Sequence, residues 1–249
     1  SRRRSNPGHR PNSSANVRKR PQLRESPSVA RAPSGVVSLV ERRDHNGAAM
    51  ALSNDEIREL RERFEASGAM QAYTKRRTAF LDTQRRVDAL SDDELRSPEG
   101  QRMVWSARGI GSVGPGESVN LDGAYEDEEI ATALVGVRHN DWGNTVEERA
   151  RRLQEEADHI LALVNERYAT RLPHAKLARA FAVLRPHETT TCFDWGYAKA
   201  SAMKFLGRRV EGRVATATLV GHRVAQVLGA DADRDACVTR AQLVWWVSS

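Results

Sequence analysis

The feature that most constrains this chain is an amphipathic repeat that begins directly after a helix-start signal at Thr145. Thr145-Val-Glu-Glu148 has the spacing of a capping box, in which the hydroxyl and the carboxylate each satisfy a backbone N–H of the first turn. The apolar residues that follow recur at helical spacing: Val146, Leu153, Ala157, Ile160, Val164 and Tyr168. Such a stripe has to be buried against other elements. The repeat therefore predicts helices that share one interior.

Other helix signals occur along most of the chain. Ser53-Asn-Asp-Glu56 and Ser91-Asp-Asp-Glu94 are two further capping boxes. Helical patterns also cover 74–90, 173–184, 197–206, 214–228 and a last stretch from about Arg234 that ends in Leu243-Val-Trp-Trp-Val247. Strand signals are sparse, but Met103-Val-Trp105 and Ser118-Val-Asn-Leu121 could pair as a small hairpin. The predicted fold is mainly α, a helical domain with one small β-hairpin.

Residues 1–49 differ from the rest of the chain in composition. They hold eleven Lys or Arg against three acidic residues, whereas the remaining 200 residues hold 28 basic and 30 acidic ones. A segment rich in Arg, Pro, Ser and Asn cannot bury enough apolar surface to offset its ordering entropy, so we expect a disordered basic tail. Because Met50 would make a natural start, the tail is also open to being an upstream extension with no native role. Residues 50–249 form the predicted helical domain, with a division into 50–144 and 145–249 left open.

Composition narrows the function classes further. No apolar run approaches the length of a membrane span, so no membrane partner is expected. Two cysteines, Cys192 and Cys237, are too few for a disulfide framework and suit a reducing compartment, which predicts a cytoplasmic protein.

A glycine-rich stretch from Gly109 to Gly114 has the spelling G-x-G-x-x-G. A dinucleotide site needs a helix that starts at the third glycine, but Pro115-Gly116 follows at once and favours a turn. The chain contains neither a G-x-x-x-x-G-K-[ST] motif nor histidines at metal-binding spacing. We therefore interpret the glycines as a hairpin connection and predict no cofactor, no metal and no catalytic residue.

An aromatic and basic stretch is the most unusual part of the sequence. Trp195 and Tyr197 follow Thr189-Thr-Thr-Cys-Phe-Asp194, and four cations come soon after: Lys199, Lys204, Arg208 and Arg209. Aromatic faces can stack on bases while cations bind phosphate, so the stretch is a candidate nucleic-acid surface. The basic residues Lys75, Arg76 and Arg77 are a second candidate contact. The competing interpretation is a loop that caps the core, with a solvated basic helix behind it.

A catalytic interpretation of the same region rests on Cys192. A thiol nucleophile there could use His187 and Asp194, which are near in sequence. A single cysteine before an aromatic residue is also typical of a small buried side chain, so this interpretation stays an alternative.

The segment Leu172–Gly196, with Arg185-Pro186 and then Thr189-Thr-Thr191, resembles the helical region upstream of the motor in bacterial AAA+ proteins of the McrBC type, which restrict DNA with modified cytosine. Residues 105–121 are similar to part of the same region. The resemblance covers about a third of the chain and implies a recognition or adaptor module of a defence ATPase. DNA, other protein subunits and a following motor domain are the partners that it implies, and it carries over no catalytic residue.

Three functional hypotheses follow. The first is a non-catalytic module of a restriction or antiviral defence system that contacts DNA through the basic and aromatic residues named above. The second is a protein interaction module that docks through the apolar C-terminal helix around Trp245 and Trp246. The third is an enzyme whose site is built from scattered residues.

Overall fold

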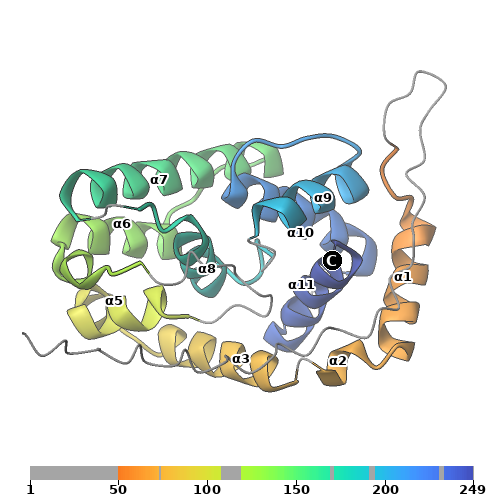
Figure 1. Ribbon diagram of the computed structural model, residues 1–249, viewed down its shortest axis with the longest axis horizontal. Helices are drawn as coiled ribbons and strands as arrows, with labels where there is room; N and C mark the ends of the chain where they lie inside the picture. Colours follow the sequence, from red (N-terminus) through yellow and green to blue (C-terminus); the bar gives the residue numbers. More distant parts are fainter. Residues whose placement is uncertain are drawn as a thin grey trace, which may run out of the picture. The chain divides into compact units, whose positions relative to one another are not determined.

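Helices make up the regular structure in the computed structural model, which describes residues 50–72, 74–107, 119–168, 171–190, 194–229 and 233–248, with the backbone alone at 72, 75 and 76 (Figure 1). Eleven α-helices and one 3₁₀ helix lie in these residues, and no β-strand does. They are α1 (Asn54–Ala66), α2 (Ala69–Ala72), α3 (Thr74–Asp88), α4 (Asp92–Arg96), α5 (Pro98–Trp105), η2 (Asp122–Glu126), α6 (Glu128–His139), α7 (Val146–Arg167), α8 (His174–Leu184), α9 (Trp195–Leu206), α10 (Arg213–Leu228) and α11 (Arg234–Ser248). The mainly helical prediction is confirmed.

The predicted capping boxes do start helices. Ser53 and Ser91 each accept a hydrogen bond from the backbone N–H three residues on, and the glutamate at that position reaches back to the serine N–H. At Thr145 the arrangement differs, because Glu148 accepts from the backbone N–H of Asn144 at 3.3 Å instead. In all three cases a local side chain satisfies the orphan donors of a first turn, which is why these helix starts are visible in the sequence.

The predicted hairpin is not found in the described part of the chain. Met103–Trp105 forms the last turn of α5, and residues 119–121 lead into η2 without strand pairing. Ser97 caps the start of α5, because its hydroxyl accepts from the N–H of Gly100, and Pro98 lies in the first turn of the helix. A run of three apolar residues was too short to distinguish a strand from the end of this helix.

Two apolar clusters form the interior. The larger draws residues from α3 to α8, including Phe80, Trp105 and Phe181. The smaller lies around Phe64 of α1 and Phe205 of α9. Helices α10 and α11 contribute side chains to both clusters, so these two helices join the two parts of the interior.

Helix α11 is one of the most buried elements. Leu243 and Val244 are fully buried and Trp245 is 8% exposed, while Trp246 packs against Phe64 at 5.6 Å between ring centroids. Contacts with α1, α9 and α10 cover the helix (Figure 1). The apolar C-terminal run, expected to offer a docking surface, is therefore covered largely by helices of the same chain.

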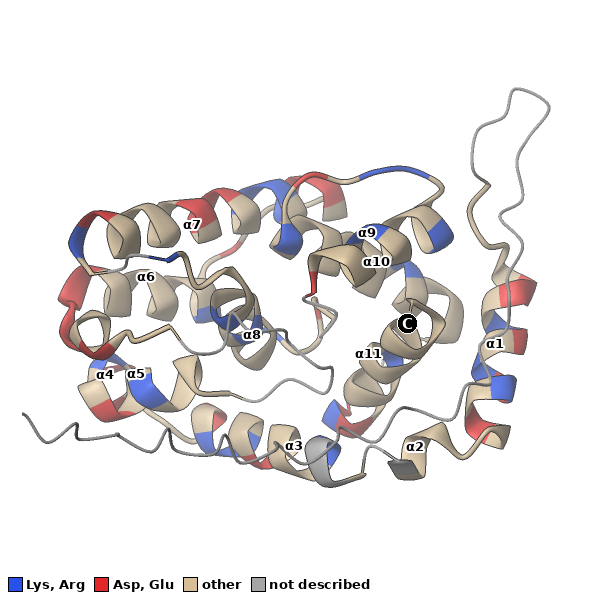
Figure 2. Ribbon diagram, in the orientation of Figure 1, with Lys and Arg blue, Asp and Glu red and all other residues tan. Residues whose placement is uncertain are grey.

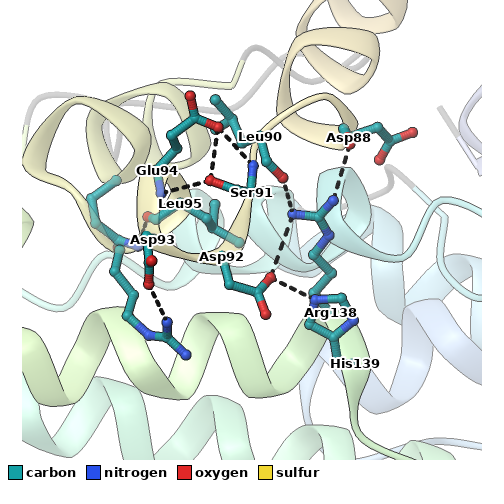
Figure 3. A network of polar contacts seen from close by, with 11 residues as sticks. Asp88, Leu90, Ser91, Asp92, Asp93, Glu94, Leu95, Arg138 and His139 are labelled. Carbon is teal, nitrogen blue, oxygen red and sulfur yellow. Dashed lines mark hydrogen bonds and ion pairs between the residues drawn. The ribbon is translucent and has the colours of Figure 1, made fainter.

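Arginine side chains close the ends of two helices. Arg138 of α6 donates to the backbone carbonyls of Leu90 at 2.8 Å and Asp88 at 3.0 Å, just where α3 ends (Figure 3). Arg185, which follows α8, donates in turn to the carbonyls of Val137 at 3.1 Å and Asn140 at 3.3 Å at the end of α6. Each guanidinium satisfies carbonyls that have no partner within their own helix.

Two of the predicted regions, the tail 1–49 and the glycine connection 109–118, lie outside the described residues. In the part that is described, no helix is both long enough and apolar enough to cross a bilayer.

Candidate nucleic-acid interface

The aromatic and basic stretch folds into α9 and the connection that follows it. Asp194 caps α9 by accepting from the backbone N–H groups of Gly196 at 2.9 Å and Tyr197 at 3.3 Å. The helix ends at Gly207, whose φ of +66° is the left-handed conformation that glycine adopts at such ends. Residues 207–212 then lead to α10. Trp195 is thereby placed at the exposed start of α9, one helix length from the connection.

Two cations flank the ring of Trp195. The ammonium nitrogen of Lys199, one turn further along α9, lies 4.8 Å from the ring centroid, and the guanidinium carbon of Arg213 in α10 lies 5.8 Å from it. These distances are in the range of cation–π attraction. The indole is half-buried, so part of its surface faces solvent beside both charges.

The connection between α9 and α10 adds two more positive charges. Arg208 and Arg209 are both exposed, and neither forms a hydrogen bond or an ion pair with the described residues. Figure 2 shows Lys and Arg on α9 and along this connection. We call Trp195, Lys199, Arg208, Arg209 and Arg213 the basic surface.

A pocket of about 240 Å³ opens beside the basic surface. Its walls come from α7, α8 and the first turns of α9 and α10, and its described lining consists of Gln154, Ala157, Asp158, Leu161, His174, Leu177, Ala178, Trp195, Gly212, Arg213 and Val214. We call this cavity the Trp195 pocket.

Gln154 of α7 lines the pocket and links α7 to the start of α10. Its side-chain oxygen accepts from the backbone N–H groups of Val214 at 2.9 Å and Ala215 at 3.2 Å, and its amide nitrogen donates to Asp158 at 2.9 Å. The N-cap position of α10 is Gly212, which has no side chain to satisfy these donors. Gln154 therefore supplies the missing cap from a distant helix.

Burial shifts the pKa values of two side chains that line the pocket. The pKa of His174 is lowered below 6.5, mainly by burial and then by the nearby positive charge of Arg213, so this imidazole is neutral at pH 7. Burial also lowers the pKa of Arg213, with the carboxylate of Asp194 acting in the opposite direction. Arg213 stays charged at pH 7.

Several residues that the sequence nominated for nucleic-acid contact have structural partners instead. Lys204 donates to the carbonyl of Val247 at 2.6 Å, and Tyr197 packs edge-on against Trp245 at 6.4 Å between ring centroids. Both side chains therefore tie α9 to α11. Periodicity could not show this, because the partner helix lies about forty residues further on.

Arg77 is likewise held between helices. Its guanidinium binds the carboxylate and the backbone carbonyl of Asp235, and it donates to the side-chain oxygen of Gln242 at 2.8 Å. The side chain is only 12% exposed. Lys75 and Arg76 lie in α3, but their side chains are outside the described part of the chain. The structure thus brings Arg77 to α11 and not to the basic surface.

The alternative cysteine site involves one residue that the structure does not describe and one that has another sulfur as its neighbour. Cys192 is outside the described residues, and Nδ1 of His187 lies 3.2 Å from the sulfur of Cys237. Arg240 also donates to that sulfur at 3.3 Å. Cys237 is 4% exposed, so this arrangement buries the thiol. No local pattern could have paired His187 with a cysteine fifty positions away.

A second polar cluster surrounds Asp92 at the start of α4. Its carboxylate lies 2.7 Å from Nε2 of His139 and 3.9 Å from Arg138 (Figure 3). The hydrogen bond from His139 is the largest cause that lowers the pKa of Asp92. Arg138 is already bound to the end of α3, so this cluster joins helices α3, α4 and α6 and serves the fold.

No known protein family, curated protein or solved structure matches this chain.

Proposed function

We propose that the helical body binds nucleic acid without catalysis, through the basic surface. The observation that carries the proposal is that Arg208 and Arg209 are two exposed cations that no described residue binds, in the connection that follows the helix whose first residue is Trp195. Cations without protein partners are available to phosphates, and an indole face can stack on an unpaired base. This combination favours a single-stranded nucleic acid over a duplex, and DNA is the form that the resemblance implies.

The resemblance to the McrBC type supports a place for this surface in a DNA-acting restriction system. In that role the chain is the recognition or adaptor module, and hydrolysis belongs to a motor domain that follows it. The genomic sequence after Ser249 tests this context. A G-x-x-x-x-G-K-[ST] motif within roughly the next hundred residues is expected, and an unrelated or absent reading frame would remove the support.

Salt dependence tests the surface itself. The double variant R208Q/R209Q removes two phosphate contacts, so the slope of log K against log salt should become shallower by about 1.4 for single-stranded DNA. Fluorescence anisotropy with a labelled oligonucleotide, over several salt concentrations, measures the slope. The full chain is used because the basic tail adds the same background to every variant.

A matched control removes the same charge elsewhere. R58Q/R63Q changes two exposed arginines on α1 that already pair with Asp55 and Glu59. This variant loses the same net charge but no proposed phosphate contact. Its slope should therefore change only by the small amount that the lower net charge causes. If both double variants change the slope equally, DNA responds to overall charge and the basic surface is not the interface.

Trp195 separates stacking from charge. W195A should weaken binding of single-stranded DNA by about tenfold or more, since stacking contributes roughly 1–3 kcal/mol per base. Binding of a duplex of equal length should change much less, because its bases are already stacked. Equal losses for both DNA forms would argue against stacking on this ring.

A further inference from the structure

One residue in the connection between α9 and α10 differs from its neighbours in burial. Arg208, Arg209 and Glu211 are exposed, whereas Val210 between them is partly buried. Its side chain packs against a third apolar cluster, which is smaller than the two that form the interior. Because an apolar side chain is stabilised when it leaves water, Val210 attaches the middle of a charged connection to the body of the protein.

The third cluster is built by α7 and by the helices on both sides of the connection. Its buried members are Ala150 of α7 and Ala215 and Leu219 of α10, and the partly buried side chains packed against them are Val146, Leu206 and Val210. Leu206 is the last residue of α9, so the chain contacts the cluster just before the connection, in its middle and again in α10.

The two ends of the connection are fixed by the backbone as well. Gly207 has a φ of +66° and Gly212 a φ of +83°, both in the left-handed region that favours glycine. Directly after Gly212, the side-chain oxygen of Gln154 accepts from the backbone N–H of Val214 at 2.9 Å. The arginines 208 and 209 are therefore carried by a short segment that is held at its start, its middle and its end.

This attachment matters for a surface that binds phosphate. A mobile connection would lose backbone freedom when its arginines bind a strand, and that loss would reduce the affinity. A connection that is already ordered avoids the backbone part of this cost, although the long arginine side chains still have to be fixed. Affinity can therefore depend on a residue that carries no charge.

We propose that Val210 is a positioning residue of the basic surface, which orders the connection 207–212 so that Arg208 and Arg209 meet the phosphates of a strand from a fixed backbone. The inference rests on the proposed function of that surface. Val210 has no group that binds phosphate, so its role is separate from the charge of the two arginines.

The order of the connection is measurable in the full chain without DNA. The ¹⁵N relaxation order parameters of the Arg208 and Arg209 amides should be about 0.8 in the wild type and should fall below about 0.6 in V210S. Serine is smaller and polar, so it gains little from packing against the cluster. V210I should keep the wild-type values, because isoleucine remains apolar and β-branched.

Binding of single-stranded DNA is the second measurement. V210S should weaken it by about threefold to tenfold at constant salt, since backbone order must then be gained on binding. The slope of log K against log salt should not change, because the substitution removes no charge. R208Q/R209Q should show the opposite combination, with a shallower slope. V210I should bind within about twofold of the wild type. Fluorescence anisotropy with a labelled oligonucleotide measures each protein.

The matched control is V146S, which makes the same substitution against the same cluster. Val146 is the first residue of α7 and lies outside the connection. V146S should lower the melting temperature as V210S does, yet it should keep the wild-type DNA affinity and the order parameters of Arg208 and Arg209. If V210S does not fold, V210A replaces it, and the wild-type order parameters need no variant.

The role of Val210 is overturned by any of three results. They are order parameters below about 0.6 for Arg208 and Arg209 in the wild type, wild-type DNA affinity in folded V210S, and equal losses of affinity in V210S and V146S. These results leave the effect of R208Q/R209Q on the salt slope intact. An unchanged slope in R208Q/R209Q would instead remove the DNA surface, and the role of Val210 in binding with it.

Discussion

Gln154 shows how a single side chain can complete an element to which it does not belong. The first N–H groups of α10 follow Gly212, whose φ of +83° is accessible to glycine and strained for other residues. A Cβ at this position would lie 2.2 Å from the Gln154 oxygen. The absence of a side chain at 212 and the presence of an amide at 154 therefore depend on each other.

Replacing Gln154 with alanine removes the cap of α10. We expect a loss of about 0.5–2 kcal/mol in the free energy of unfolding, the usual cost of removing a capping side chain. Urea unfolding followed by circular dichroism measures it. Gln226, which is exposed on α10, provides the matched control. Q226A should change the free energy of unfolding by less than about 0.5 kcal/mol. Equal effects of the two substitutions would show that Gln154 is not a cap.

Local signals explain which elements could be predicted. Helix starts such as Ser53 and Ser91 depend on residues within four positions, so their capping boxes are legible in the sequence. Arg77 and Asp235 lie 158 positions apart, and nothing near either residue indicates their contact. The sequence could therefore predict helices but not which of its cations had partners in the fold.

At the scale of elements, Arg77 joins α3 to α11. R77A should cost about 1–3 kcal/mol in unfolding free energy, because it removes charge-assisted bonds from a side chain that is largely buried. Asp235 is 58% exposed, so solvent screening keeps the loss toward the lower end of that range. R77K should recover only part of the stability, since an ammonium cannot reproduce the fork. Chemical denaturation measures all three proteins.

An exposed arginine on the same helix is the control for Arg77. Arg85 pairs with Asp82 at 3.0 Å on the surface of α3, and R85A should cost less than about 0.5 kcal/mol. The salt slope for DNA binding should be the same in R77A as in R85A, because neither residue belongs to the basic surface. A loss of stability in R85A as large as that in R77A would contradict the role of Arg77 in joining α3 to α11.

For the whole molecule, acid stability depends on paired carboxylates. The pKa of Asp92 is lowered from its ordinary value of 3.8 by the hydrogen bond from His139. The pKa of Asp127 is also lowered, since bonds from Arg167, Ile130 and Tyr168 outweigh the raising effect of burial. A lowered folded-state pKa means that the stabilisation is present above the unfolded value and is lost as pH falls through the folded value.

The melting temperature should therefore decrease as the pH is lowered below about 4. As the pH falls below about 4, D92N should lose less stability than the wild type, because its side chain no longer takes up a proton. D93N is the control, since Asp93 is 97% exposed and pairs with Arg96 on the surface. Parallel curves for D92N and the wild type would show that the Asp92 pair does not contribute.

The basic surface could be predicted only in part from the sequence. The sequence placed Trp195 and the four later cations together because they are near in the chain, and the structure keeps Lys199, Arg208 and Arg209 at the surface. Lys204 and Tyr197 left this group because α11 lies against them. The Trp195 pocket depends on α7, α8 and α10 meeting, and periodicity alone does not specify which helices meet.

The arginine contacts at the ends of α3 and α6 determine which helix ends a shortened chain would leave without partners. Arg185, beyond α8, closes the end of α6, and Arg138 of α6 closes the end of α3. A fragment that stops at Asn144 would retain the second closure and lose the first, exposing carbonyls at the last turn of α6. Its final helix would fray, and the position of Arg138 over α3 would loosen with it, so cutting the chain at this point weakens helices well before the cut.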